Sequence, residues 1–185
     1  MNLVGIDEVG RGALAGPVIA CALANVSYAI PVKDSKSLSP KKRSDIAKKI
    51  RLSDAIFSFG ECTHAEIDNM NIHHATLEAM KRAVYGISCL PSKVCVDGCF
   101  APILDKFKTI SVETIIKGDQ KIEEIMAASI LAKVYRDNLM NNFHTLYPSY
   151  GFNRNKGYGT REHIEALKVK GPSPIHRLTF SGVIQ

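Results

Sequence analysis

The chain has 185 residues, of which 45% are hydrophobic and 23% are charged, and these ordinary proportions exclude long disordered stretches. No apolar run approaches the roughly 20 residues that a membrane-spanning helix needs, so a membrane protein is also excluded. The 24 Lys and Arg residues outnumber the 18 Asp and Glu residues, and the net charge of +6 favours a polyanionic partner.

The first half of the chain predicts three strands and one helix. Gly10-Arg11-Gly12 separates two apolar runs and indicates a turn between paired strands. Ser39 followed by Pro40 is typical of a helix start, because serine caps a helix and proline suits its first position. In chain order we expect a strand over 2–9, a strand over 17–24, a helix from 40 to about 51 and a strand over 55–61.

The second half predicts helices that alternate with strands. Thr63 with Glu66 three residues later forms a capping-box pattern, and small residues within 127–132 allow a long helix to pack closely on a sheet. Thr160 is expected to cap the last helix, after a glycine-rich loop over 151–159. In chain order we expect a short helix from 63, a helix over 72–87, strands over 93–97 and 110–117, and helices over 122–147 and 160–170. This pattern predicts an α/β fold with a mixed sheet.

Five cysteines form an odd set without a CxxC pair, and no secretory segment opens the sequence; both observations favour a reducing, cytoplasmic location. Cys95 and Cys99 flank Asp97, and metal ligation is one interpretation of them. Two cysteines lack the four-ligand pattern of structural zinc, so we interpret them as small buried hydrophobic residues.

Four acidic residues fall where predicted strands end. Asp7 and Glu8 close the first strand, Asp97 closes the fourth, and Asp119 follows the fifth. If those strand ends are neighbours, the carboxylates form an all-oxygen site suited to Mg²⁺ or Mn²⁺ and to phosphoryl transfer. The alternative is that each carboxylate faces solvent, which is the commoner arrangement for a single acidic residue at a strand end. Because adjacent residues of a strand point to opposite faces, Asp7 and Glu8 share one site only if the strand twists or bulges near the glycine turn.

Several motifs together resemble the type 2 ribonucleases H, also called ribonuclease HII. The opening Gly5-Ile6-Asp7-Glu8-Val9-Gly10-Arg11-Gly12 resembles the start of that family. Further matching motifs follow in the family's order: Asp34-Ser35-Lys36, Asn71-Ile72-His73-His74-Ala75-Thr76, Val96-Asp97-Gly98, Lys117-Gly118-Asp119, Ala127-Ala128-Ser129-Ile130-Leu131-Ala132-Lys133-Val134, Arg136-Asp137, Lys156-Gly157-Tyr158-Gly159-Thr160, and His176-Arg177 with Phe180. The resemblance covers nearly the whole chain.

The resemblance implies a single ribonuclease H-like catalytic domain over 1–185, with a mixed five-stranded sheet flanked by helices and a helical, substrate-holding C-terminal part over about 140–185. It implies an endonuclease that hydrolyses the RNA strand of RNA–DNA hybrids and cuts 5′ of single ribonucleotides embedded in duplex DNA, leaving 5′-phosphate and 3′-hydroxyl ends. Such an enzyme serves ribonucleotide removal in DNA repair and replication, and we expect a monomer.

The resemblance also assigns site residues. The catalytic quartet that would hold two Mg²⁺ or Mn²⁺ ions is Asp7, Glu8, Asp97 and Asp119. Asp137 competes for the fourth place, but it lies inside the long predicted helix, where a structural ion pair is the simpler interpretation.

The resemblance and the chemistry of these residue types also point to residues that bind substrate. In Gly10-Arg11-Gly12 the glycines let backbone groups approach a 2′-hydroxyl, and the arginine can meet a phosphate; an ordinary turn is the alternative. Tyr158 resembles the family's tyrosine that packs on the sugar after the ribonucleotide, and the alternative is a core residue. Lys36, Asn71 and Arg136 match family positions that hold phosphates.

Two other function classes stay open at this stage. One is another nuclease of the same fold, such as a resolvase or transposase core, which lacks the glycine turn and Tyr158. The other is a basic nucleic-acid-binding module without catalysis, against which the four carboxylates argue. The sister type 3 enzymes usually carry an extra N-terminal substrate-binding domain, which we do not expect here because Asp7 lies so near the start; Gly10-Arg11-Gly12 also favours type 2. We interpret His73, His74, His144 and His163 as structural or surface residues.

Overall fold

The computed structural model describes residues 3–26, 38–107 and 109–183. Their elements are β1 (Leu3–Val9), β2 (Val18–Ala24), α1 (Pro40–Arg51), β3 (Ile56–Cys62), α2 (His64–Gly86), β4 (Lys93–Asp97), β5 (Ser111–Ile115), the 3-10 turn η1 (Gly118–Gln120), α3 (Glu123–Leu146), η2 (Pro148–Tyr150), α4 (Phe152–Asn155) and α5 (Arg161–Lys170). Each strand and long helix lies within a few residues of its predicted range.

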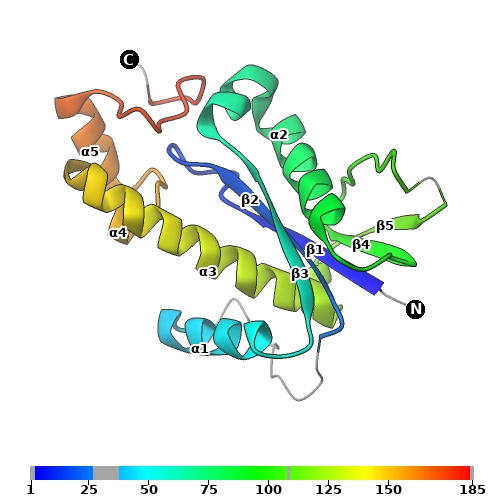
Figure 1. Ribbon diagram of the computed structural model, residues 1–185. Helices are drawn as coiled ribbons and strands as arrows, with labels where there is room; N and C mark the ends of the chain where they lie inside the picture. Colours follow the sequence, from blue (N-terminus) through cyan, green and yellow to red (C-terminus); the bar gives the residue numbers. More distant parts are fainter. Residues whose placement is uncertain (1–2, 27–37, 108, 184–185) are drawn as a thin grey trace.

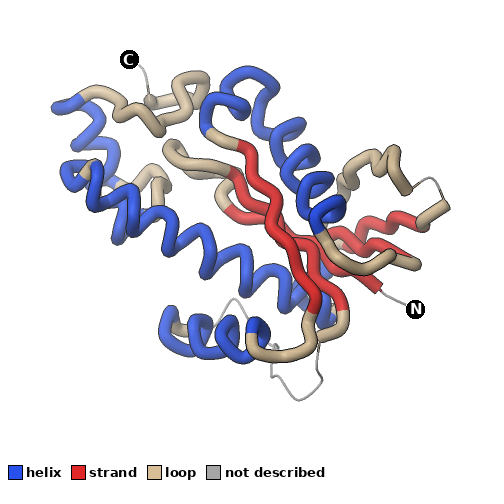
Figure 2. Tube along the Cα trace, in the orientation of Figure 1, coloured by secondary structure: helices blue, strands red, loops and turns tan. Residues whose placement is uncertain are grey.

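The five strands form one mixed sheet, as predicted, and their order in it is β3-β2-β1-β4-β5 (Figure 2). β2 is antiparallel to both of its neighbours, whereas β1, β4 and β5 run parallel. All seven residues of β2 are buried. The C-terminal ends of β1 and β4 therefore meet at one edge of the sheet, close to the turn that leads into β2.

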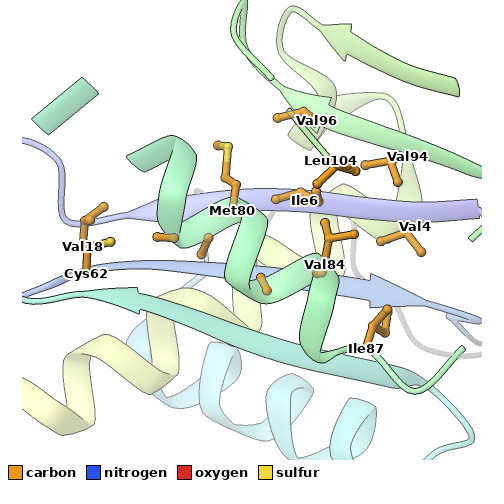
Figure 3. Packing of buried hydrophobic residues seen from close by; sticks show 14 of the residues in the cluster. Val4, Ile6, Val18, Cys62, Met80, Val84, Ile87, Val94, Val96 and Leu104 are labelled. Carbon is orange, nitrogen blue, oxygen red and sulfur yellow. The ribbon is translucent and has the colours of Figure 1, made fainter. Parts of the chain in front are cut away.

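Helices cover both faces of the sheet: α2 lies on one face, and α1 with α3 lies on the other (Figure 1). Val4 and Ile6 of β1 pack with Val84 of α2 in the first hydrophobic cluster (Figure 3). The small residues predicted to allow close packing do so, because Ala127 and Ala128 of α3 are fully buried against the opposite face. α3 thereby spans from the start of β1 to the C-terminal helices.

The predicted helix starts are confirmed by their caps. The Ser39 hydroxyl accepts a hydrogen bond from the Lys42 amide, and the Thr160 hydroxyl accepts one from the His163 amide. Thr63 and Glu66 form the full capping box. Each such cap stabilises its helix by about 1 kcal/mol, which explains why local sequence alone locates these starts.

α2 is broken at Asn71, whose backbone has φ of 68° and ψ of 164°. The Asn71 side-chain oxygen accepts hydrogen bonds from the amides of His73 at 2.9 Å and His74 at 3.1 Å, so it caps the second part of the helix. The predicted division into a short and a longer helix is therefore confirmed.

The glycine-rich stretch 151–159 differs from the prediction of a loop, because it contains the short helix α4. Phe152 is fully buried in a third hydrophobic cluster with Met140 of α3. The Asn155 side chain donates to the Tyr150 carbonyl at 2.6 Å and accepts from the Gly157 amide at 2.8 Å. The burial of Phe152 and these two hydrogen bonds stabilise a helical turn. The sequence did not indicate it, because the flanking glycines are typical of a loop.

All five cysteines are free. Cys95 is buried as predicted, but Cys99 is exposed, because it follows Gly98 beyond the end of β4; the prediction of burial is wrong there. Across the described part of the chain, no helix combines the length and apolar character needed to cross a bilayer.

Candidate active site

The parallel pairing of β1 with β4 brings acidic residues together at the sheet edge. Its last paired positions are Ile6 and Val96, so Asp7 and Asp97 follow side by side on neighbouring strands. Asp7 is almost buried, with 7% of its surface exposed, and its carboxylate accepts a hydrogen bond from the Glu8 amide at 2.7 Å. The predicted meeting of strand ends is therefore present for these residues.

Glu8 lies on the other side of β1. The strand pairs regularly with β2 through this region, with Glu8 opposite Ala20, so the bulge considered as a way to unite Asp7 and Glu8 does not form. Glu8 and Asp97 instead line a small pocket on the α2 side, whereas the Ser129 side chain of α3 hydrogen-bonds Asp7 on the opposite side. Asp97 interacts electrostatically with both carboxylates from the next strand.

The carboxylates make each other hard to ionise. Burial, together with the negative charges of Glu8 and Asp97, raises the pKa of Asp7 to about 8 against the opposing hydrogen bond from Ser129. Burial also raises the pKa of Glu8, and Asp97 adds to this rise while Arg11 opposes it. A cation placed among them would relieve this repulsion.

Asp119 approaches the same place from η1. The chain turns back after β5 through Lys117, which has a left-handed φ of 56°. The amides of Gly118 and Asp119 then donate to the Asp97 carboxylate oxygen at 2.7 and 3.4 Å. Asp119 itself is 4% exposed. The backbone of the fourth acidic residue therefore contacts Asp97, and the role of its carboxylate in the cluster stays a prediction.

These residues fit a hard divalent cation. The donors are carboxylate oxygens, which Mg²⁺ and Mn²⁺ prefer, and their mutual repulsion favours a bound positive charge. Among the described residues, no three acidic, histidine or cysteine side chains converge closely enough to hold an ion alone. Mg²⁺ characteristically keeps several water ligands and takes only one or two carboxylates together with substrate phosphates, so an open carboxylate cluster suits it.

We expect Asp7→Asn to stabilise the protein in metal-free buffer at pH 7. The pKa of Asp7 is about 8 in the folded protein and 3.8 ordinarily, so the folded state keeps this carboxyl protonated at pH values where the unfolded chain ionises it. The free energy of unfolding therefore falls as the pH rises from 3.8 to about 8. Asparagine avoids this loss and should raise the free energy of unfolding by roughly 1–4 kcal/mol. Urea unfolding of both proteins in the presence of a chelator measures this difference in the free energy of unfolding. The exposed control Asp54→Asn should change stability by less than about 0.5 kcal/mol, and a destabilised Asp7→Asn would contradict the electrostatic description.

A buried arginine, Arg177, hydrogen-bonds the backbone of the glycine turn after β1. Arg177 donates to the carbonyls of Gly10 at 2.7 Å, Arg11 at 2.8 Å and Gly16 at 3.0 Å. Gly10 has a φ of 96°, and a side chain there would collide with Arg136. Since these carbonyls point inward, the turn has a fixed shape.

The outer surface of the turn is open. Gly12 is exposed, and a side chain at this position would meet no atom within 4 Å. The Arg11 side chain is also exposed and forms an ion pair with Glu8 at 3.3 Å. The backbone at Gly12 and the charge of Arg11 are thus accessible to a ligand beside the carboxylates.

Tyr158 lies next to this turn. Its backbone pairs with Ala13, and the Leu14 amide donates to the Gly157 carbonyl at 2.7 Å. The Arg136 guanidinium lies 5.5 Å from the Tyr158 ring centre. The structure therefore brings together the two parts of the predicted ribonucleotide reader, which are about 150 residues apart in the sequence.

Arg136 differs from its prediction as a phosphate ligand. It is fully buried, and its guanidinium donates to the carbonyls of Ala15, Pro17 and Lys156. Because backbone oxygens surround the guanidinium, it fixes the turn and the Tyr158 segment and has no surface to offer a phosphate. Asn71 is exposed and caps the second part of α2, whereas Lys36 lies outside the described residues.

Sequence reasoning missed the supporting roles of Ser129 and Arg177. Both fell inside motifs of the family resemblance without receiving a role of their own, and for Arg177 the available signal was its place in the closing motif His176-Arg177. His163, interpreted as a structural or surface residue, is buried and hydrogen-bonds His176.

A mixed sheet in this order, with helices on both faces and carboxylates at the ends of β1 and β4, is the architecture of the ribonuclease H-like class of nucleases. Among solved structures, ribonuclease H2 from Pyrococcus horikoshii OT3 has a TM-score of 0.84 and 26% identity, covering 99% of this chain and 95% of its own. Bst-RNase HIII in complex with Mn²⁺ has a TM-score of 0.71 at 17% identity and covers 99% of this chain and 68% of its own, which supports the fold alone.

The family model described as Ribonuclease HII matches residues 4–183. Ribonuclease HII of Desulforamulus reducens is 45% identical over 181 residues, which is 97% of this chain and 89% of that protein. The chain therefore belongs to the ribonuclease HII family. It is a metal-dependent endonuclease that hydrolyses the RNA of RNA–DNA hybrids.

Proposed function

We propose that this enzyme also cuts duplex DNA on the 5′ side of a single embedded ribonucleotide, leaving 5′-phosphate and 3′-hydroxyl ends. The observation that carries the proposal is the position of the open glycine turn. It follows the carboxylates of β1 directly, and Tyr158 pairs with it from the C-terminal part. A reader of the ribonucleotide would thus lie beside the groups that cut.

Asp7, Glu8, Asp97 and Asp119 would hold the metal ions. Two divalent ions held there would supply an activated water and would offset the charge on the leaving oxygen. The four carboxylates would hold these ions where the scissile phosphate binds. Arg11, exposed beside Glu8, is placed to bind a neighbouring phosphate with its planar guanidinium.

The glycine turn would recognise the 2′-hydroxyl, the group that separates RNA from DNA. Gly12 leaves its backbone open to a close hydrogen bond, and the three carbonyl contacts of Arg177 keep that backbone in one shape. Tyr158 would pack its ring on the deoxyribose that follows the ribonucleotide. An additional hydroxyl on that sugar would fit less well, so cleavage would favour the RNA–DNA junction.

The C-terminal part over about 140–185 would hold the duplex, since α4, α5 and the closing segment surround the turn (Figure 1). The positions of Lys36 and Asn71 match phosphate-binding positions of the family, and we keep both as proposed contacts. We further propose a monomer acting in the cytoplasm, a location with which five free cysteines agree.

The test compares cleavage of a duplex with one ribonucleotide, a continuous RNA–DNA hybrid and an all-DNA duplex, with and without Mg²⁺ or Mn²⁺. All-DNA duplex should be cut at least roughly 10⁴-fold more slowly, because polar groups built to bind a hydroxyl stay unpaired when it is absent. Tyr158→Ala should reduce cleavage at the single ribonucleotide by roughly tenfold more than cleavage of the hybrid, as expected for lost ring packing of about 1–2 kcal/mol.

The matched control is Tyr158→Phe, which keeps the ring and removes only the hydroxyl; it should behave like the unmodified enzyme on both substrates. Equal losses on the two substrates for Tyr158→Ala would make Tyr158 a general binding or core residue. Comparable cleavage of all-DNA duplex would refute recognition of the ribonucleotide.

A further inference from the structure

Three segments that are remote in sequence meet around the glycine turn. The Leu14 amide donates to the Gly157 carbonyl at 2.7 Å, and the Arg177 amide donates to the Leu14 carbonyl at 2.9 Å. Two residues further along this segment, the Gly16 amide donates to the Ile175 carbonyl at 2.9 Å. The segment carrying Tyr158 and the closing segment 173–177 therefore flank the turn on either side.

Two buried histidines connect these flanking segments. His163 of α5 and His176 of the closing segment are at most 1% exposed, and their Nε2 atoms are 2.9 Å apart. The other ring nitrogen of His163 lies 2.9 Å from the Tyr158 carbonyl oxygen. The other ring nitrogen of His176 lies 2.8 Å from the Ser173 amide and 2.7 Å from the Ser173 hydroxyl.

The partners fix the position of every ring proton. A backbone amide only donates, so Nδ1 of His176 must accept from Ser173 and its proton must reside on Nε2. That Nε2–H donates to Nε2 of His163, which leaves the His163 proton on Nδ1. His163 Nδ1–H then donates to the Tyr158 carbonyl. The four groups form one directional chain of hydrogen bonds, which requires both rings to be neutral.

The surroundings favour neutral rings. Phe152 packs edge-on against His163, with ring centres 5.4 Å apart, and the Tyr150 ring centre lies 5.0 Å from that of His176. Burial lowers the pKa of both histidines, and burial together with the charges of His163 and His64 lowers the pKa of His176 to about 4. Ser173 opposes this with its hydrogen bond, and Asp68 lines the same pocket as His64 and His176.

We propose that His163 and His176 are positioning residues that hold Tyr158 in place for substrate selection through this chain of hydrogen bonds. The inference rests on the proposed role of Tyr158. Its carbonyl accepts both from His163 and from the Thr160 amide at 2.8 Å, so two donors fix the peptide that follows the ring. Because the chain starts at Ser173, the placement of Tyr158 is tied to the same closing segment whose Arg177 holds the glycine turn.

The first test needs no substitution in the hydrogen-bonded chain and no activity. Long-range proton–nitrogen correlation spectra of histidine-labelled protein at neutral pH should show His163 protonated on Nδ1 and His176 protonated on Nε2. A charged ring, the opposite tautomer or fast exchange between tautomers at either residue would overturn the proposal, whatever Tyr158 does with substrate.

The second test separates the hydrogen bond from His163 to the Tyr158 carbonyl from the hydrogen bond between His163 and His176. At position 163, asparagine places its amide nitrogen near the former Nδ1 and can still donate to the Tyr158 carbonyl. Glutamine reaches the former Nε2 and can only meet His176. The readout is the ratio of cleavage rates on the single-ribonucleotide duplex and on the continuous hybrid, from which any loss of folded enzyme cancels.

The ratio should fall roughly tenfold for His163→Gln, about the effect of one lost hydrogen bond, and should stay within about twofold for His163→Asn. A merely structural role would lower stability in both variants and leave both ratios unchanged, which would overturn the proposal. If Tyr158→Ala itself leaves the ratio unchanged, the proposed function of Tyr158 fails separately, while the tautomers still decide whether the hydrogen-bonded chain exists.

Discussion

Replacing Asp97 with asparagine should remove nearly all turnover while the protein stays folded. Asp97 is the residue that joins the cluster, because it interacts with Asp7 and Glu8 and accepts the amides of Gly118 and Asp119. The asparagine oxygen can accept the same two amides, so the local fold persists. The lost charge weakens metal binding, and the loss of several kcal/mol of transition-state stabilisation corresponds to roughly a 10³-fold lower rate.

The measurement is the single-turnover rate on an RNA–DNA hybrid at several Mg²⁺ and Mn²⁺ concentrations, together with thermal unfolding. Asp105→Asn is a suitable control, because Asp105 carries the same charge in an exposed ion pair with Lys81. It should leave the rate within about twofold, since exposed pairs contribute little. An Asp97→Asn variant with normal turnover would show that Asp97 does not hold the metal.

Local signals were sufficient for the fold. Ser39, Thr63 and Thr160 satisfy backbone amides within three residues of themselves, so a helix start can be recognised from four letters. Alternating helices and strands then predicted the mixed sheet, and the strand ends predicted the meeting of Asp7 with Asp97. These features depend on short stretches of sequence or on the ordinary topology of α/β folds.

The supports of the site depend on long-range contacts. Arg136 binds Ala15 and Pro17, more than 100 residues away, and Arg177 binds Gly10 across an even longer interval. An arginine in a polar helix is ordinarily exposed, so its burial follows from tertiary structure alone. The family resemblance implied a phosphate ligand at Arg136, whereas in the structure its guanidinium connects the turn to the Lys156 carbonyl.

The separation of Asp7 from Glu8 shows a different limit. The two-residue period of a strand correctly predicts that they lie on opposite faces. A bulge would bring both carboxylates into one site, but β1 pairs regularly with β2 at these residues. The structure keeps the strand regular and lets Asp97, one strand away, interact with both. A single strand could not reveal this arrangement, because it depends on the register between β1 and β4.

Asp119→Ala should inactivate the enzyme severely, whereas Asp137→Ala should lose only a little stability. Asp119 is buried beside Asp97, and its removal takes a negative charge from the proposed metal site. We expect a rate at least roughly 10²-fold lower, equivalent to about 3 kcal/mol of barrier. Asp137 forms an ion pair with Lys133 at 2.8 Å, four residues earlier on α3, and such pairs contribute less than about 1 kcal/mol.

Substituting both positions in one set of assays decides between the two acids. Each variant is measured for cleavage of the hybrid and for its free energy of unfolding, and Asp119→Asn is added because asparagine keeps the shape and removes the charge. If the charge of Asp119 matters, alanine and asparagine should inactivate alike, while Asp137→Ala should follow the unmodified enzyme in rate. An inactive Asp137→Ala beside an active Asp119→Ala would move the fourth metal ligand from η1 to α3. In that case Lys133, which now holds Asp137, would have to release it when metal binds.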